Sequence, residues 1–299
     1  MSNLVNLVKF LEDQEPPVEI EYLSRASNFS VLISTYIKDD VKDFEHEVKS
    51  IFNNTIVPNE ILITIDRPVT SEMNQLLEYF TKLLPNVVRI LRQKINQGRG
   101  NIAAFGVESA RYELIAKMDS DDIAILQRFE KQLSLMLNNN VDVLGGQISE
   151  FDESFEIISR RVVPVTQEEI VDFSRMRSPI NQPTVMFRRS SVLKVGNYTN
   201  LNVLEDYDLW MRMIANKMIF QNVDEDLVYM RAFRQMYQRR GGIQYFKQYA
   251  SFRKGLLRRK FISYWDYYKS MIGMLVVSLI PTVVRKKIYV IFLRNSRIR

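Results

Sequence analysis

The chain has 299 residues, 46% of them hydrophobic, which is enough for a substantial core in one large domain with an appendage or in two domains. It contains no cysteine, which excludes disulfides, thiolate metal sites and thiol catalysis and favours a reducing compartment. Residues 231–299 hold 17 Lys or Arg and one acid, whereas the first 230 residues hold 24 basic and 34 acidic residues. The tail therefore has a net charge of +16 and the rest of the chain −10. This asymmetry indicates a polyanionic partner for the tail, either a membrane surface or nucleic acid.

The chain begins with a segment, residues 1–28, that contains one short amphipathic helical pattern and a linker with Pro16 and Pro17. We expect a covering extension rather than a domain. The first residues lack a basic leader followed by an apolar core, so no secretory signal is predicted and the protein is expected in the cytosol.

From residue 29 onwards, short apolar runs alternate with amphipathic helical patterns. Strands are predicted at residues 29–34, 60–65, 87–91 and 114–118, and helices after residue 40 and at residues 72–84 and 102–109. This alternation is typical of a parallel, doubly wound α/β sheet. In such a sheet, ligands bind at the edge formed by the carboxyl ends of the strands.

The fourth strand leads into residues 119–122, sequence DSDD, which we call the acidic turn. Carboxylates packed this closely repel one another and suit a site where a divalent cation balances them. The alternative is a solvated turn in which Asp122 caps a helix that begins near Ile123. The single histidine, His46, is predicted on the solvated side of its helix, so a metal would have oxygen ligands, which selects Mg²⁺ or Mn²⁺ over Zn²⁺.

A second group of acids follows much later in the chain. After a predicted helix to residue 138, a strand at residues 141–146 and a mixed segment, Glu205 and Asp206 begin a helical pattern with an apolar stripe behind them. Acids in a first turn complement the helix dipole without any catalytic role, so this pair taken alone does not indicate a site.

The order of these pieces is more informative than any one of them. A strand ending in Asp66, a glycine-bearing loop at residues 96–100, then Gly106, the acidic turn and the later acidic pair closely resemble the family-2, GT-A-fold glycosyltransferases. The resemblance covers residues 29–230 and implies a Rossmann-like, mainly parallel sheet flanked by helices. Residues 231–299 would then be a basic, amphipathic C-terminal helical region.

Two further segments are most similar to bacterial enzymes that build capsular, exopolysaccharide or lipopolysaccharide chains. They are residues 181–188 and residues 239–242. The family implies transfer of a sugar from a nucleoside-diphosphate sugar, either a UDP- or a GDP-sugar, to a saccharide or lipid-linked acceptor with inversion of configuration.

The resemblance also implies roles for individual residues. Asp119 and Asp121 would hold Mn²⁺ or Mg²⁺, and Asp206 would be the general base, with Glu205 as its neighbour or alternative. Arg67 follows Asp66 where the family has a second acid, which changes the shape expected of the base pocket. The implied donor-binding residues are Thr35, Tyr36, Asp66, Asn96, Gly98, Arg99, Asp119, Arg239 and Arg240.

The basic tail carries a separate prediction. Aromatic and basic residues interleave over residues 246–260, and residues 271–284 are almost wholly apolar but shorter than the roughly 20 residues that span a bilayer. We therefore expect an interfacial helix that holds the protein at the inner face of the cell membrane, against anionic lipid and without nucleic acid. The alternative is a helix pair that packs on the catalytic domain with a solvated basic face.

Two other functions remain open from the sequence. The acidic turn could serve another metal-dependent phosphoryl-transfer enzyme, although Ile123 and Ala124 stand where an aspartate-nucleophile phosphatase would have a different pattern. The tail could belong to a non-catalytic membrane- or nucleic-acid-binding protein, which would leave the paired acidic sites unexplained.

Overall fold

The computed structural model describes residues 3–13, 28–94, 97–201, 203–232 and 242–279. The helices are α1 (Asn3–Asp13), α2 (Val41–Phe52), α3 (Ser71–Leu83), α4 (Arg99–Ser109), α5 (Arg128–Asn138), α6 (Gln167–Ser174), α7 (Arg189–Lys194), α8 (Glu205–Ala215), α10 (Gly242–Arg258) and α11 (Tyr264–Leu279). The strands are β1 (Phe29–Thr35), β2 (Glu60–Ile65), β3 (Val88–Arg92), β4 (Leu114–Asp119), β5 (Ile123–Ala124), β6 (Val143–Phe151), β7 (Ile157–Arg161), β8 (Met186–Arg188) and β9 (Phe220–Arg231).

The strands form one sheet in the order β3-β2-β1-β4-β8-β6-β9-β5, with β7 paired to β6. The first four strands predicted from the sequence, β1 to β4, are parallel. Their register places Ser34 opposite Asp119 and Thr35 opposite Ile65, so these strands end at one edge. Beyond β4 the sheet is mixed, because β8 runs antiparallel to both β4 and β6.

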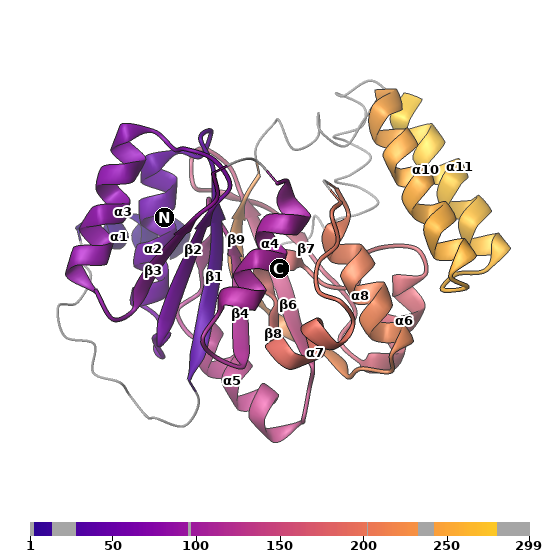
Figure 1. The fold of residues 1–299 in the computed structure, drawn as a ribbon, viewed down its shortest axis with the longest axis horizontal. Helices are drawn as coiled ribbons and strands as arrows, with labels where there is room; N and C mark the ends of the chain where they lie inside the picture. Colours follow the sequence, from indigo (N-terminus) through magenta and orange to yellow (C-terminus); the bar gives the residue numbers. More distant parts are fainter. Residues whose placement is uncertain (1–2, 14–27, 95–96, 202, 233–241, 280–299) are drawn as a thin grey trace.

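Helices cover both faces of this sheet (Figure 1). On one face, Phe44 of α2, Phe80 of α3 and Phe129 of α5 belong to a single buried cluster. On the other, Val107 of α4 and Trp210 of α8 pack with residues of α6 and α7. Burial of large apolar side chains on both faces is the main contribution to the stability of such a three-layer fold.

The helix pair α10 and α11 lies side by side at the end of the molecule opposite α3 (Figure 1). One side of the pair packs on α8 through a cluster of Tyr207, Met211, Phe252, Leu256 and Ile262. In the described part of the chain, no helix combines the length and hydrophobicity that crossing a membrane requires.

Candidate active site

The carboxyl ends of β1, β2 and β4 bring Thr35, Asp66 and the acidic turn to one edge of the sheet, as predicted. Within the acidic turn the three carboxylates differ in exposure. Asp119 is exposed, Asp121 is half-buried and Asp122 is only 1% exposed. The turn therefore offers two carboxylates to a ligand and directs the third into the protein.

Asp122 does not cap a helix, which corrects one of the two interpretations of the turn. A two-residue strand, β5, follows it, and α5 begins only at Arg128. The Asp122 carboxylate instead accepts a hydrogen bond from the backbone N–H of Arg231 at 3.1 Å, because β9 ends beside the turn. Burial, followed by the charges of Asp121 and Asp119, raises the pKa of Asp122 well above its usual range.

A buried ionisable layer lies beneath the turn. Glu47 of α2 is fully buried, and neither of its carboxylate oxygens has a hydrogen-bond partner among the described residues. Burial and then the charge of Asp122 raise its pKa well above the usual range. Arg128 donates a hydrogen bond to the Lys117 carbonyl at 2.9 Å. Burial lowers the pKa of Arg128 to about 9, although the negative charges of Asp122 and Glu47 act to raise it.

Asp39 is a site residue that the sequence analysis did not single out. Its carboxylate accepts the Thr35 hydroxyl at 3.0 Å and the Tyr36 N–H at 3.1 Å, and it also bonds the side chain of Ser120 in the acidic turn. The neighbouring Asp40 takes the capping role by accepting the first N–H groups of α2. The sequence shows that Asp39 and Asp40 are adjacent, but it does not show which of them caps the helix. It therefore could not assign the other acid to the site.

The donor set fits a hard divalent cation. Burial, together with the charges of Asp119 and Asp39, raises the pKa of Asp121 to about 7, so a bound cation would relieve repulsion that the protein otherwise bears. Among the described residues, acids and histidine do not form a ready-made group of three or more metal ligands. Two carboxylates nevertheless match what Mg²⁺ or Mn²⁺ commonly takes from a protein when phosphate and water complete its shell.

The prediction for His46 is wrong, because its side chain is buried rather than solvated. It is 8% exposed, and burial lowers its pKa. The helix α1 packs on α2 and brings Glu12 within electrostatic range, which no local pattern around His46 predicts.

Asp66 anchors the glycine-bearing loop. Its carboxylate accepts the N–H of Gln97 at 2.8 Å and that of Gly98 at 3.3 Å. Gly98 has a φ of 85°, which favours glycine, and it precedes the first turn of α4. Asn96 lies outside the described residues. The proposed contact of Asp66 with the nucleotide base stays a prediction.

The acidic pair at the start of α8 faces the same region as the acidic turn. Burial and the charge of Asp206 raise the pKa of Glu205 to about 7, Arg99 opposes this, and Asp119 adds to it. The same carboxylates act on the buried Tyr198, whose hydroxyl accepts from Gln182 at 2.9 Å. Arg99 from α4, Asp119 from β4 and the pair from α8 therefore lie within electrostatic range of one another.

Asp208, in the same first turn of α8, has a different role. Its carboxylate binds Arg212 at 2.9 Å and Arg259 of the tail at 2.6 Å. Although burial raises its pKa, the hydrogen bonds and charges of these two arginines outweigh that effect and lower it. Arg239 and Arg240, predicted to approach the diphosphate, lie outside the described residues.

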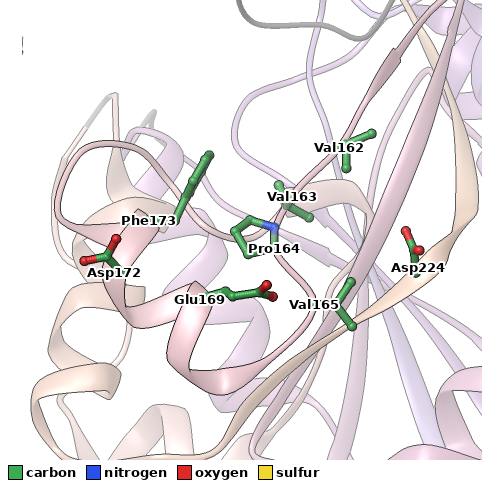
Figure 2. A pocket seen from close by; sticks show the side chains of 8 residues that line it. All are labelled: Val162, Val163, Pro164, Val165, Glu169, Asp172, Phe173 and Asp224. Atoms are coloured by element: carbon green, nitrogen blue, oxygen red, sulfur yellow. The ribbon is translucent and has the colours of Figure 1, made fainter. Parts of the chain in front are cut away.

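A separate shallow pocket of about 450 Å³ lies beside α6 (Figure 2). Apolar side chains from the connection between β7 and α6 form one wall, and carboxylates from α6 and β9 lie around it (Figure 2). Its lining includes none of the predicted site residues and consists of Val162, Val163, Pro164, Val165, Glu169, Asp172, Phe173 and Asp224.

Comparison with known proteins gives the same result as the geometry. Residues 30–227 match Glycosyl transferase family 2. Over 264 residues the chain is 34% identical to the UDP-Gal:alpha-D-GlcNAc-diphosphoundecaprenol beta-1,3-galactosyltransferase of Escherichia coli, covering 87% of this chain and 94% of that enzyme. Over 220 residues it is 34% identical to the amylovoran biosynthesis glycosyltransferase AmsE of Erwinia amylovora, covering 73% and 82% of the two chains.

A solved structure shares the fold. The mannosyltransferase PcManGT from Pyrobaculum calidifontis, in complex with GDP-Man and Mn²⁺, aligns with a TM-score of 0.58 and 11% identity over 85% of this chain and 71% of its own. The predicted fold class is thereby confirmed, and a catalytic glycosyltransferase replaces both the phosphoryl-transfer and the non-catalytic alternatives. The chain belongs to glycosyltransferase family 2.

Proposed function

We propose that this enzyme transfers a hexose from a UDP-sugar to a saccharide carried on a lipid diphosphate, with inversion at the anomeric carbon, in the synthesis of a bacterial surface polysaccharide. The observation that carries the proposal is the electrostatic interaction of Glu205 with Asp206, Arg99 and Asp119, which links the start of α8 to α4 and the acidic turn. The E. coli relative uses UDP-Gal and a diphosphoundecaprenol-linked GlcNAc acceptor, which supports the choice of donor base and acceptor class.

On the donor side, the edge of the sheet binds and orients the nucleotide. Asp39 accepts hydrogen bonds from Thr35, at the end of β1, and from Tyr36, which follows it. Gly98 and Arg99 form the N-terminus of α4, which favours the negative charge of a diphosphate. Asp119 and Asp121 would hold Mn²⁺ or Mg²⁺, which when bound stabilises the charge that develops on the departing diphosphate.

On the acceptor side, Asp206 serves as the general base. The acceptor hydroxyl oxygen bonds to the anomeric carbon while the bond from that carbon to the diphosphate oxygen breaks, and the hydroxyl proton passes to the Asp206 carboxylate. Attack from the face opposite the leaving group inverts the configuration. Glu205, whose pKa of about 7 keeps it partly protonated near neutrality, is the neighbour that limits repulsion around this base.

The decisive experiment compares Asp206→Asn with the wild-type enzyme. We expect the variant to bind UDP and Mn²⁺ normally and to transfer sugar to a diphosphate-linked GlcNAc acceptor about 10²-fold more slowly or worse, because removal of a general base has that effect. Product formation would be followed by mass spectrometry, and binding by thermal shift, where ligand at 100 times its Kd adds about 2.7 kcal/mol. Near-normal turnover would exclude Asp206 as the base, and no metal-dependent shift with any nucleoside diphosphate would reject the donor site.

A further inference from the structure

The helix α11 carries a continuous exposed apolar face. Six side chains form it, and they are between 46% and 76% exposed: Tyr264, Trp265, Tyr268, Ile272, Leu275 and Val276. At about 100° per residue these positions fall within an arc of about 120°, so they make one stripe along the helix. We call it the α11 stripe. Scattered apolar side chains are normal on a protein surface, but a continuous stripe of this kind marks an interaction surface.

The stripe points away from the rest of the protein. The other side of α11 contributes Tyr267 to the cluster between the tail and α8, and Ser270 is buried. The backbone carbonyl of Asp266 accepts a hydrogen bond from the buried Arg253 of α10 at 3.1 Å. Packing within the hairpin formed by α10 and α11 therefore fixes which face of α11 is presented to solvent.

The charges around the stripe indicate what covers it. The one acid in α10 and α11, Asp266, accepts the backbone N–H and hydroxyl of Ser263 as a local cap. Lys269 borders the stripe, and the exposed basic residues of the described hairpin are Lys247, Lys254, Arg258, Arg259, Lys260 and Lys269. An apolar stripe with Trp and Tyr at one end and a lysine at its border, on a hairpin rich in exposed basic residues, complements the headgroups and upper acyl region of an anionic bilayer.

The hairpin is joined to the catalytic helix by residues next to the general base. Arg253 is completely buried and donates to the Tyr207 hydroxyl at 3.2 Å, and that hydroxyl donates to the Ser174 carbonyl. Arg259 forms an ion pair with Asp208 at 2.6 Å. Tyr207 and Asp208 directly follow Glu205 and Asp206, so one turn of α8 bears both the catalytic carboxylates and the attachment of the hairpin.

We propose that the α11 stripe lies on an anionic lipid bilayer and that its attachment through Arg253 and Arg259 to α8 sets the position of the catalytic carboxylates relative to the membrane surface. The positioning part of this inference rests on the proposed function, because a lipid-diphosphate acceptor presents its sugar at the membrane surface. The partner itself, an anionic lipid surface, is recognised by the stripe independently of any reaction.

The first test measures binding alone. Full-length wild-type protein, the stripe variant Trp265→Ser/Ile272→Ser and the control Leu137→Ser/Ile219→Ser, which alters two other exposed apolar residues, are sedimented with vesicles. Vesicles contain equal parts of phosphatidylglycerol and phosphatidylcholine, or phosphatidylcholine alone. We expect the stripe variant to lose more than tenfold in partitioning to anionic vesicles, the control to match the wild type, and neutral vesicles to bind weakly.

The proposal would be overturned if the stripe variant bound anionic vesicles as well as wild type does. It would also be overturned if wild-type protein did not bind vesicles and instead self-associated through the stripe in analytical ultracentrifugation.

The second test compares acceptors. With a short-chain, water-soluble diphosphate acceptor, the turnover of the stripe variant should be within about twofold of wild type. With an undecaprenyl acceptor in anionic vesicles, its turnover should be more than tenfold below that of wild type. If the variant matches wild type on both acceptors, the positioning role is overturned. If the wild type transfers sugar to neither acceptor, the proposed function fails while the vesicle measurement still decides the surface.

Discussion

At the scale of single residues, neighbouring acids in this enzyme have different roles because their partners differ. Asp39 joins the Thr35 loop to the acidic turn, while Asp40 caps α2. Asp206 is the proposed general base, while Asp208 forms ion pairs with Arg212 and Arg259. The identity of the residue is the same in each pair, so geometry and not composition decides which carboxylate can serve chemistry.

We expect Asp39→Ala to weaken binding of UDP about tenfold in the presence of Mn²⁺. Hydrogen bonds to a charged group are worth about 1.5–3 kcal/mol, and the lower end applies to a partly exposed carboxylate. Titration calorimetry would measure the affinity. The matched control is Asp40→Ala, which removes the cap of α2, lowers the free energy of unfolding by about 1 kcal/mol and leaves UDP affinity unchanged. Equal loss of affinity in both variants would mean that Asp39 acts only through stability.

The pKa of Asp208 predicts the pH dependence of stability. Because its folded pKa is lowered, the carboxylate contributes stability above the pKa of the unfolded chain, and this contribution disappears as pH falls through the folded value. Asp208→Asn should therefore lower the free energy of unfolding by about 3 kcal/mol at pH 7 and by much less in acid. Denaturant titrations at both pH values, with the exposed Asp172→Asn as control, measure it. A loss that is independent of pH would contradict the ion-pair explanation.

At the scale of elements, close contact between backbones connects the proposed donor side of the site with the proposed acceptor side. Gly100 lies in the first turn of α4 against the segment that precedes α8, and a methyl group there would stand 1.8 Å from the Thr199 carbonyl oxygen. A side chain is therefore excluded, and α4 approaches the segment at residues 199–201, which leads into α8, as closely as the two backbones allow.

We predict that Gly100→Ala separates these two segments and lowers kcat/KM about tenfold or more with the fold intact, since displacement of a catalytic group by about 1 Å can cost about 10²-fold. Steady-state kinetics and circular dichroism measure the two properties. The matched control is Gly255→Ala in α10, where a methyl group meets no heavy atom within 4 Å. That variant should keep its activity and gain about 0.5–1 kcal/mol of stability. Full activity in Gly100→Ala would show that α4 and α8 need not approach so closely.

At the scale of the whole molecule, the sequence predicts the half of the sheet that is built from local patterns. Apolar runs predict β1 to β4 and helical patterns separate them, and their order places the acidic turn at the edge formed by the carboxyl ends of these strands. β9 was not predicted, because polar residues 224–226 interrupt its apolar pattern where its register with β6 shifts. Its pairing with β6 joins segments far apart in the chain, which no local period reveals.

The candidate site divides in the same way. Asp119, Asp121, Glu205 and Asp206 could be selected from their order along the chain. Beneath them, Glu47, Arg128 and Arg231 come from three separate elements and acquire their role only through burial in the folded protein. Their side chains fall within ordinary helix and strand patterns, so the sequence gives no signal that they lie under the acidic turn.

The double use of the first turn of α8 has a consequence for the exchange of parts between related enzymes. A chimera that joins the tail of one relative at the start of α10 would separate Arg253 and Arg259 from the Tyr207 and Asp208 that receive them. A junction placed before Leu204 would move the whole unit, carboxylates included. Recombination within this family should therefore yield active hybrids when α8 is exchanged together with the tail. That result would place the proposed acceptor site and the proposed membrane attachment in one exchangeable segment.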